Sequence, residues 1–375
     1  MNGVTRERVE NITNQPHIFA FKFSGGTVDF SVHERNFDGT LKELHRPSGG
    51  PWGGTCVDDR YIAWLTELFG AATMEQFKAE SMGDFIDVLR DFETKKRSVL
   101  TATTGMITFR IPAALKECNE ESGDEQIVTK IARLNLKEDV KIKRDKLNVA
   151  ADIVRSWFEE SIYNTVRHVS TVLSEPAMKD VNTILLVGGY GECQLVQDAI
   201  GKAVGKRTVL VPEDAGLAVL KGAVKFGHQP RLVKSRCMKY TYGISMSDYF
   251  DESKHPKERI EIDSYGRQII RHCFKKIIEL GSSVEMFTEC KLPTMCLNRI
   301  ENTWIKVFRS TSPSPVYTTD QSCSPIGSLV VEKTPWEKQD DNAVEISFSF
   351  GDTELKASVK IIKTGEVHTK IIDCL

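Results

Sequence analysis

The chain has 375 residues, of which 40% are apolar and 27% are charged, an ordinary composition for a protein that folds around buried cores. Its formal net charge of −2 and pI of about 6.5 exclude a broadly basic surface for nucleic acid or anionic lipid. A polar N-terminus and short aliphatic runs predict neither a signal peptide nor a membrane span.

The first predicted element is a β-hairpin. From residue 17 to residue 33, apolar residues alternate on both sides of the pair Gly25-Gly26, which favours two strands joined by a glycine turn. A third strand is expected near residues 41–45. The glycine-rich segment SGGPWGGT (48–55) follows it.

Helices are expected next. They predominate from about Val57 to Lys96, where apolar residues recur at helical spacing: Met82, Phe85, Ile86, Leu89 and Phe92. The charged segment 117–126 predicts a surface loop. A second apolar stripe predicts one long helix that ends before Pro176: Val154, Phe158, Ile162, Val166, Val169 and Leu173.

An alternation of strands and helices follows this long helix. The buried-type strand TILLV (183–187) runs into a glycine turn, and a helix over about 194–204, a strand at 208–211 and a helix to about Phe226 come after it. This order is typical of an α/β domain. From residue 232 onward, short β-branched and aromatic runs separated by turn residues predict a β-rich domain: 303–310, 328–333, 343–351 and 354–362.

Two glycine turns are candidate binding elements. In the turn of the first hairpin, Gly25 and Gly26 allow backbone N–H groups to approach a phosphate, and the Thr27 hydroxyl can add a hydrogen bond. A plain hairpin turn is the alternative. Gly188 and Gly189, followed by Tyr190, lie between a buried strand and a helix, where polar ligand groups are favoured. Their spacing is not GxGxxG, which excludes a dinucleotide-binding turn, and a simple strand-to-helix turn is the alternative.

A third candidate element is a charged group on one helix. Glu93, Lys96 and Arg97 are spaced i, i+3 and i+4, so they share one helix face just past its apolar stripe. They are interpreted either as a solvated ion-pair surface or as a clamp on an adenine and its ribose.

Taken in order, these motifs resemble a known family. GGTVD, GGPWGGTCVD, ETKKR, LLVGGYGE and VPEDAGLAVLKGA are similar to the second lobe of the actin-like nucleotide-binding domain of 70-kDa heat-shock proteins. GGPWGGTCVD, KGAVKFGHQP and FGDTELKASV indicate the divergent 12A/12B subfamily. The resemblance covers roughly residues 17–375, although the tail differs from the family's usual peptide-binding domain.

The resemblance implies a fold and a domain division. We expect an α/β fold, the second lobe of an actin-like (ribonuclease-H-like) ATPase with an inserted helical subdomain, plus a β-rich C-terminal domain. Residues 1–16 are expected to be disordered or frayed. The nucleotide-binding lobe would span residues 17–231, with its helical insert at about 58–126, and the β-rich domain would span residues 232–375.

The resemblance also implies a ligand, ATP or ADP. Phosphate contacts would come from Gly25, Gly26 and Thr27. The adenosine would be held by two groups of residues: Glu93, Lys96 and Arg97 on the helix, and Gly188, Gly189 and Tyr190 in the second turn. No catalytic residue and no metal ligand is assigned.

Two departures from the family pattern bear on hydrolysis. The family's first phosphate loop, catalytic lysine and water-positioning glutamate belong to a first lobe, which this sequence does not encode, so the chain resembles a truncated member. Lys22 stands where the family has an aspartate used around magnesium and the attacking water, and a cation there should weaken Mg²⁺ retention. We therefore expect little or no ATPase activity.

Two functions remain open from the sequence. The first is a chaperone-related nucleotide-binding protein, and the second is a non-catalytic scaffold whose surfaces bind protein partners. A sugar or acetate kinase of the same superfamily is disfavoured by the GGPWGG and FGDTE segments. The nine cysteines include no CxxC pair, which indicates free thiols and a cytoplasmic protein. Neither nucleic acid nor membrane is expected as a partner.

Overall fold

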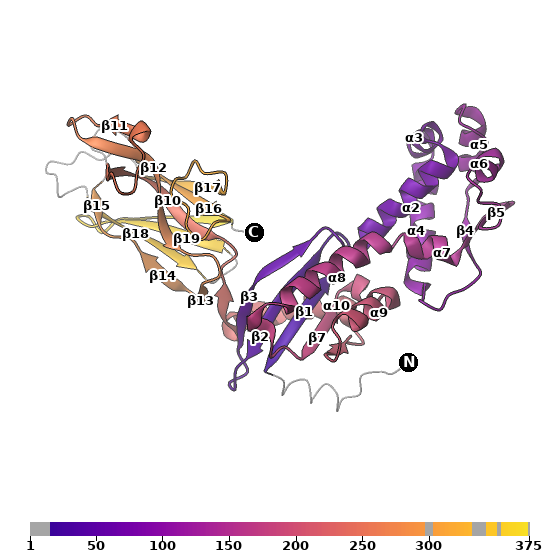
Figure 1. The fold of residues 1–375 in the computed structure, drawn as a ribbon, viewed down its shortest axis with the longest axis horizontal. Coiled ribbons are helices and arrows are strands. Elements are labelled where there is room, and N and C mark those ends of the chain that lie inside the picture. Colours follow the sequence, from indigo (N-terminus) through magenta and orange to yellow (C-terminus); the bar gives the residue numbers. More distant parts are fainter. Residues whose placement is uncertain (1–15, 297–302, 332–342, 351–353, 374–375) are drawn as a thin grey trace. The chain divides into compact units, whose positions relative to one another are not determined.

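A computed structural model describes residues 16–296, 303–331, 343–350 and 354–373 (Figure 1). The chain forms two compact units. The first comprises the residues up to Val32 together with 48–228, and the second comprises 33–47 and the residues from Gln229 onward. Among the described helices, none has both the length and the apolar character that crossing a membrane requires.

The first unit is built on a sheet in the order β3-β2-β1-β7-β8. Its strands are β1 (His17–Phe23), β2 (Val28–Arg35), β3 (Leu41–Gly50), β7 (Thr183–Val187) and β8 (Thr208–Leu210), of which the distal parts of β2 and β3 belong to the second unit. The hairpin and the third strand predicted from sequence are confirmed. Strands β1 and β7 are parallel, with Lys22 opposite Val187, so both strands end at the same edge and deliver their glycine turns there.

One face of this sheet is aromatic because β1 and β2 alternate apolar and polar residues. Phe19, Phe21, Phe23 and Phe30 are all buried and pack edge to face. Helix α8 (Glu159–Leu173) packs on this face, where His168 lies 4.8 Å from Phe30, ring centre to ring centre. The remaining elements of this part are α7 (Ala151–Ser156), η1 (Pro176–Met178), η2 (Gly189–Glu192), α9 (Gln194–Ala203) and α10 (Ala215–His228).

The predicted long helix is two helices in the structure. Helix α7 ends at Ser156 and α8 begins at Glu159, because Trp157 and Phe158 turn inward between them and are both buried. The burial expected for Val154, Phe158 and Val169 is confirmed.

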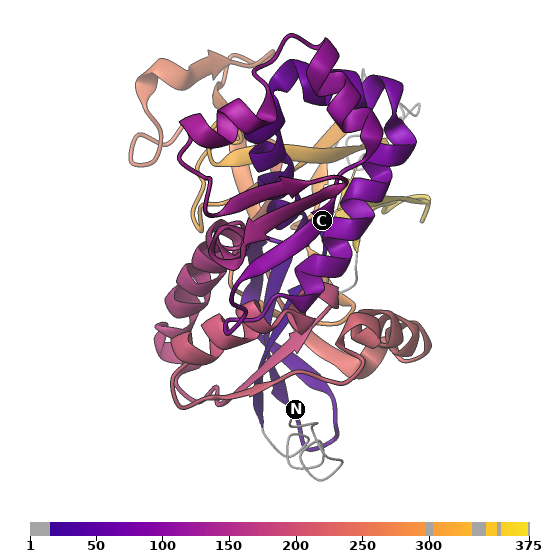
Figure 2. The same cartoon turned by 90° about the vertical axis from the view of Figure 1, so that its right-hand side faces the viewer.

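An inserted subdomain lies between β3 and α7. It contains α2 (Gly54–Phe69), α3 (Ala71–Glu80), α4 (Met82–Ser98), α5 (Ala113–Glu121) and α6 (Ile127–Arg133), with a small sheet in the order β4-β6-β5: Met106–Arg110, Lys146–Ala150 and Val140–Lys143. Figure 2 shows this sheet beside the helices of the insert. Tyr61 stacks on Phe92 at 4.1 Å between ring centres, and Phe109 and Trp157 complete this core.

Two expectations fail in the insert, and one sheet there was not expected. The segment 117–126 is not all loop, because residues up to Glu121 continue α5, which buries Leu115, Cys118 and Asn119. In α4 the expected stripe is shifted: Met82 and Ile86 are exposed, whereas Val88 is buried. The three-stranded sheet β4-β6-β5 was not predicted from the sequence.

The second unit is β-rich, as predicted. Its strands are β9 (Val233–Cys237), β10 (Thr241–Tyr249), β11 (Ile260–Ile262), β12 (Gln268–Ile278), β13 (Ser283–Glu285), β14 (Thr288–Lys291), β15 (Met295–Cys296), β16 (Thr303–Ser310), β17 (Cys323–Val331), β18 (Ala343–Phe350), β19 (Glu354–Ile361) and β20 (Val367–Asp373). Short helices lie at η3 (Pro230–Leu232) and η4 (Lys257–Arg259). Sheets β11-β12-β10-β16-β17 and β14-β18-β19-β20 share one apolar core that includes Ile244, Val307 and Phe348.

Candidate functional site

The turn between β1 and β2 is closed by its own polar groups. The Ser24 N–H donates to the Thr27 carbonyl oxygen at 2.9 Å, the Ser24 hydroxyl donates to the same oxygen at 2.8 Å, and the Thr27 N–H donates to that hydroxyl at 3.2 Å. Gly25 and Gly26 form the exposed tip, and their N–H groups donate to no acceptor within the described part of the chain. These are the two donors that a phosphate would meet.

The glycine-rich segment that leads into the first residues of α2 packs against this turn. The Gly54 N–H donates to the Ser24 carbonyl at 3.2 Å, and both the backbone N–H and the hydroxyl of Thr55 donate to the Gly25 carbonyl, at 2.7 and 2.9 Å. A Cβ on Gly53 would lie 2.4 Å from the Gly25 carbonyl oxygen, so only glycine permits this approach. The segment binds the turn's carbonyl oxygens and leaves its tip N–H groups exposed.

The second turn also depends on a glycine. Gly188 has φ of 89°, and a Cβ there would lie 2.1 Å from the carbonyl oxygen of Phe23. The Gly188 N–H donates to the Ala215 carbonyl oxygen at 2.7 Å, and the Glu192 carboxylate accepts from the Gly216 N–H at 3.0 Å. These contacts hold η2 against β1 and against the start of α10.

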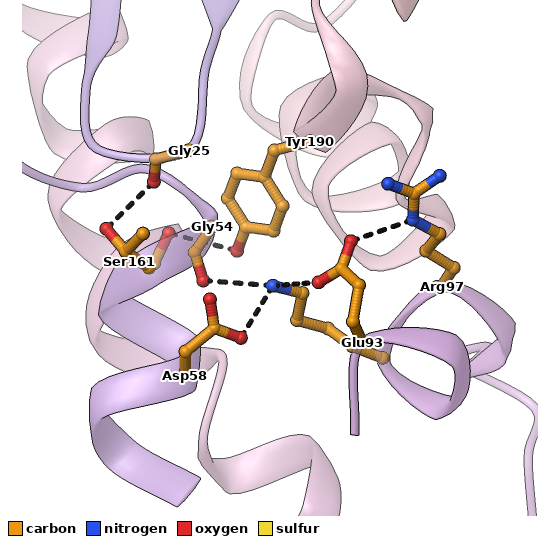
Figure 3. A network of polar contacts seen from close by, with 9 residues as sticks. Gly25, Gly54, Asp58, Glu93, Arg97, Ser161 and Tyr190 are labelled. Atoms are coloured by element: carbon orange, nitrogen blue, oxygen red, sulfur yellow. Dashed lines mark hydrogen bonds and ion pairs between the residues drawn. The ribbon is translucent and has the colours of Figure 1, made fainter. Parts of the chain in front are cut away.

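Tyr190 is fixed from that turn by a buried hydrogen bond. The Ser161 hydroxyl donates to the Trp52 carbonyl at 2.5 Å, so the Tyr190 hydroxyl, 3.0 Å away, is the donor to Ser161. Burial raises the pKa of Tyr190 well above its usual range, although the Ser161 hydrogen bond opposes that shift. Tyr190 is therefore a neutral side chain with a fixed ring orientation (Figure 3).

The end of α4 supplies the charged wall. The Lys96 ammonium contacts the Glu93 carboxylate at 2.6 Å, the Asp58 carboxylate at 2.7 Å and the Gly54 carbonyl at 3.3 Å, and its side chain is only 8% exposed. Arg97, which is 66% exposed, donates from Nε to Glu93 at 2.8 Å (Figure 3). The burial of Lys96 is not that of a solvated ion-pair surface.

The two carboxylates that hold Lys96 differ in proton affinity. Desolvation raises the pKa of Asp58, and the hydrogen bond from Lys96 only partly offsets it. For Glu93, partial burial also raises the pKa, but hydrogen bonds from Lys96 and Arg97 outweigh it and leave the pKa below its ordinary value. Glu93 is thus the carboxylate of the pair that keeps its negative charge to lower pH, and it is the one that Arg97 contacts.

These elements enclose a pocket of about 410 Å³, within the size range of small-molecule sites. Six of the nine residues expected at the site line it: Gly25, Glu93, Lys96, Arg97, Gly189 and Tyr190. The other three, Gly26, Thr27 and Gly188, lie in the same turns but do not line it.

Five lining residues were missed by the sequence analysis: Gly54, Thr55, Asp58, Glu192 and Cys193. Asp58 follows the glycine segment by one helical turn, so its place at the start of α2 was the available signal. Burial raises the pKa of the Cys193 thiol, which argues against a reactive thiolate at this position.

Known proteins resemble this chain over nearly all of its length. It is 28% identical to human heat shock 70 kDa protein 12B over 364 residues, 94% of this chain and 53% of that protein. Mouse heat shock 70 kDa protein 12A is 28% identical over 367 residues, with the same coverage. A shorter part of the chain, 59% of it, is 27% identical to 27% of Arabidopsis thaliana chloroplastic heat shock 70 kDa protein 7.

These similarities confirm the resemblance to 70-kDa heat-shock proteins and to their 12A/12B subfamily. The mixed α/β fold is consistent with the actin-like fold of that family. No protein-family model matches the chain. The chain spans about half the length of the curated relatives it matches.

Proposed function

We propose, from the similarity to heat shock 70 kDa proteins 12A and 12B, that this chain is a chaperone-related protein that binds ATP or ADP. Residues 17–231 would form the nucleotide-binding lobe and residues 232–375 a separate β-rich domain, in a cytoplasmic protein. The observation that carries the proposal is the pocket itself. It brings together side chains and glycine turns from four distant segments of the chain, and these are segments whose motifs carry the family resemblance.

The residues of the pocket suit the parts of a nucleoside. The Tyr190 ring and the exposed Arg97 guanidinium offer flat surfaces for an adenine. Glu93 offers carboxylate oxygens to ribose hydroxyls, and Lys96 holds it in place by their 2.6 Å ion pair. The phosphates would then lie at the tip of the first turn, where the N–H groups of Gly25 and Gly26 can donate to them.

Hydrolysis is proposed to be weak or absent in this chain. Phosphoryl transfer needs a positioned water or base and charge stabilisation from several directions. The carboxylates that line the pocket are already engaged, Asp58 and Glu93 by Lys96 and Glu192 by the Gly216 N–H. Each carboxylate of the described lining is thus oriented toward a protein donor, which disfavours its use as the base that orients a nucleophilic water.

A second candidate function is a non-catalytic interaction scaffold. It is favoured by α10, whose apolar side chains are turned to solvent: Leu217 is 54% exposed, Leu220 63% and Val224 57%. Exposed apolar surface of this kind is common at protein–protein contacts. In this alternative the pocket would be a structural relic, and the Lys96 ion pairs would serve only the fold.

Calorimetric titration of the full chain with ADP and ATP separates the two functions. Saturable binding is expected, weakened about tenfold or more by Glu93→Ala and by Gly189→Val. Gly189→Val suits the test because a Cβ at Gly189 meets no atom within 4 Å, so the new side chain enters the pocket and not the core. Glu138→Ala, which removes a 93% exposed carboxylate that does not line the pocket, is the control. If a chain shown to be folded gives no heat of binding with either nucleotide, the scaffold is the function that remains.

A further inference from the structure

The carboxylates around the first turn do not suit a magnesium ion. Mg²⁺ binds oxygen ligands in an octahedron, usually one or two free carboxylates with waters and phosphates. The carboxylate that flanks this turn is Asp29, and its Oδ2 already accepts from the Thr27 hydroxyl at 3.1 Å and pairs with the Lys22 ammonium at 3.3 Å. Across the residues that the structure describes, no group of three or more His, Cys, Asp or Glu side chains could hold a metal ion.

The same turn carries a cation that a phosphate can use. Lys22 lies two residues before Ser24, on the sheet face opposite the buried Phe21 and Phe23, and its side chain is 45% exposed. Its partner Asp29 is 50% exposed, and half-exposed ion pairs are weak. A polyphosphate, which carries several negative charges, can therefore compete with a single carboxylate for this ammonium.

We propose that Lys22 takes the part that magnesium would otherwise play, so that this chain binds the phosphates of its nucleotide without a divalent metal. The ammonium supplies the counter-charge, and the N–H groups of Gly25 and Gly26 supply the directional donors. The inference rests on the proposed nucleotide binding and adds to it the ionic form of the ligand, the metal-free polyphosphate anion.

Two consequences distinguish this arrangement from a metal-dependent one. Magnesium bound to ATP neutralises the oxygens that Lys22 would contact, so added Mg²⁺ should not strengthen binding. A lysine contact at an exposed turn is screened by salt. The difference in binding affinity between ATP and adenosine should therefore shrink as ionic strength rises. The nucleoside part of the affinity should respond little to either.

The test is calorimetric titration of the full chain with ATP and, separately, with adenosine, in EDTA and in excess Mg²⁺. We expect ATP to bind at least as tightly in EDTA as in Mg²⁺. Lys22→Met should weaken ATP binding about tenfold and leave adenosine binding unchanged. Lys22→Asp should weaken ATP binding further in EDTA and make it stronger when Mg²⁺ is added.

The matched control is Lys42→Met. Lys42 is 44% exposed and pairs with Glu34 at 3.4 Å, close to the values for Lys22, but it does not flank the turn. This variant should bind ATP as the unaltered chain does, and circular dichroism of each variant checks that it is folded.

The outcomes separate the two proposals. Adenosine binding together with ATP binding that needs Mg²⁺, or that Lys22→Met leaves unchanged, overturns the role of Lys22 and keeps the nucleotide pocket. Binding of neither ligand by the folded chain overturns both proposals. ATP binding that is metal-independent and lost with Lys22, beside unaltered adenosine binding, supports the inference.

Discussion

The pocket wall at α4 and η2 and the first turn beside the pocket are built in opposite ways. On the side of α4 and η2, Lys96 is 8% exposed and Tyr190 is buried, and each is held by hydrogen bonds or ion pairs to other segments. At the first turn, Lys22 and Asp29 are 45% and 50% exposed and form one loose ion pair. Side chains on the buried side thus stabilise the fold and would also contact a ligand. Those at the turn can be substituted with little effect on the stability of the fold.

This difference gives an expectation for every substitution at the site. On the buried side, stability and ligand affinity should fall together, since the same contacts serve both. At the turn, affinity should change alone, as for Lys22→Met, whose stability should stay within about 0.5 kcal/mol of the unaltered chain. The three predictions below test the buried side.

The largest effect is expected for Gly188→Ala. The φ of 89° at Gly188 lies in a region that residues with a Cβ rarely adopt, and the added methyl would lie 2.1 Å from the Phe23 carbonyl oxygen. We expect the free energy of unfolding to fall by about 3 kcal/mol, because either the turn or the end of β1 must move. Urea denaturation followed by circular dichroism measures it.

The neighbouring glycine is the control for this prediction. A Cβ on Gly189 meets no atom within 4 Å, so Gly189→Ala should change stability by less than about 1 kcal/mol. Equal losses of unfolding free energy from the two substitutions would show that close approach to β1 does not fix this turn. The contrast between the pocket wall at α4 and η2 and the first turn would then be unsupported.

Lys96→Met is expected to have the next largest effect. It leaves Asp58 and Glu93 facing each other without the ammonium that now lies 2.7 and 2.6 Å from them. Breaking a buried pair is costly, but both carboxylates are partly exposed, so we expect a loss of about 2 kcal/mol. Adenosine affinity should fall as well, because Glu93 loses the partner that orients it.

Lys95→Met provides the comparison on the same helix. The Lys95 side chain makes no ion pair among the residues that the structure describes, and its removal should change stability by less than about 0.5 kcal/mol. If Lys96→Met proved as mild as Lys95→Met, the charged cluster would be a surface feature after all, as the alternative interpretation of the sequence held.

The parts of the fold that the sequence predicted are those with a strong local period. The alternation of Phe19, Phe21 and Phe23 predicts a strand regardless of its partners, and TILLV before a glycine pair predicts the next. The three-stranded sheet was missed because each of its strands is only four or five residues long, too short for a clear alternation. Residues 117–121 were assigned to a loop because charge dominates them, although one face of that helix is buried.

The site was predictable only where a motif carried it. Glycine turns and the spacing of Glu93, Lys96 and Arg97 are each visible within one segment, so they could be proposed from the sequence, although only their order and the family resemblance favoured a binding role over a structural one. Asp58 was not selected, although it ends the motif GGPWGGTCVD, because its role follows from the packing of α2 against the end of α4. Nor could the burial of Lys96 be predicted, since sequence gives the charge of a lysine and not the carboxylates that pack around it.

The smallest effect is expected from acid titration of Glu93. Its pKa in the folded chain lies below the ordinary value of 4.5, so its contribution to stability is present above that pH and is lost as the pH falls through the lower folded value. Glu93→Gln should therefore be less stable than the unaltered chain near neutral pH, by at most about 1 kcal/mol because Glu93 is partly exposed. The gap should close as the pH falls below 4.5 and through the lower pKa of Glu93 in the folded chain.

Glu93→Gln must be compared with the unaltered chain at each pH, because the pKa of Asp58 is shifted in the opposite direction to that of Glu93 and its protonation changes stability in the opposite sense. Its raised pKa means that its charged form costs stability, a cost relieved as the pH falls through that raised value. Both proteins carry Asp58, so subtracting their denaturation free energies at each pH leaves Glu93 together with the part of the Asp58 pKa shift that the Glu93 charge causes. A gap that stays constant or widens in acid would mean that Lys96 and Arg97 do not hold Glu93 as an anion, and the buried side of the pocket would then be no more tightly organised than the turn.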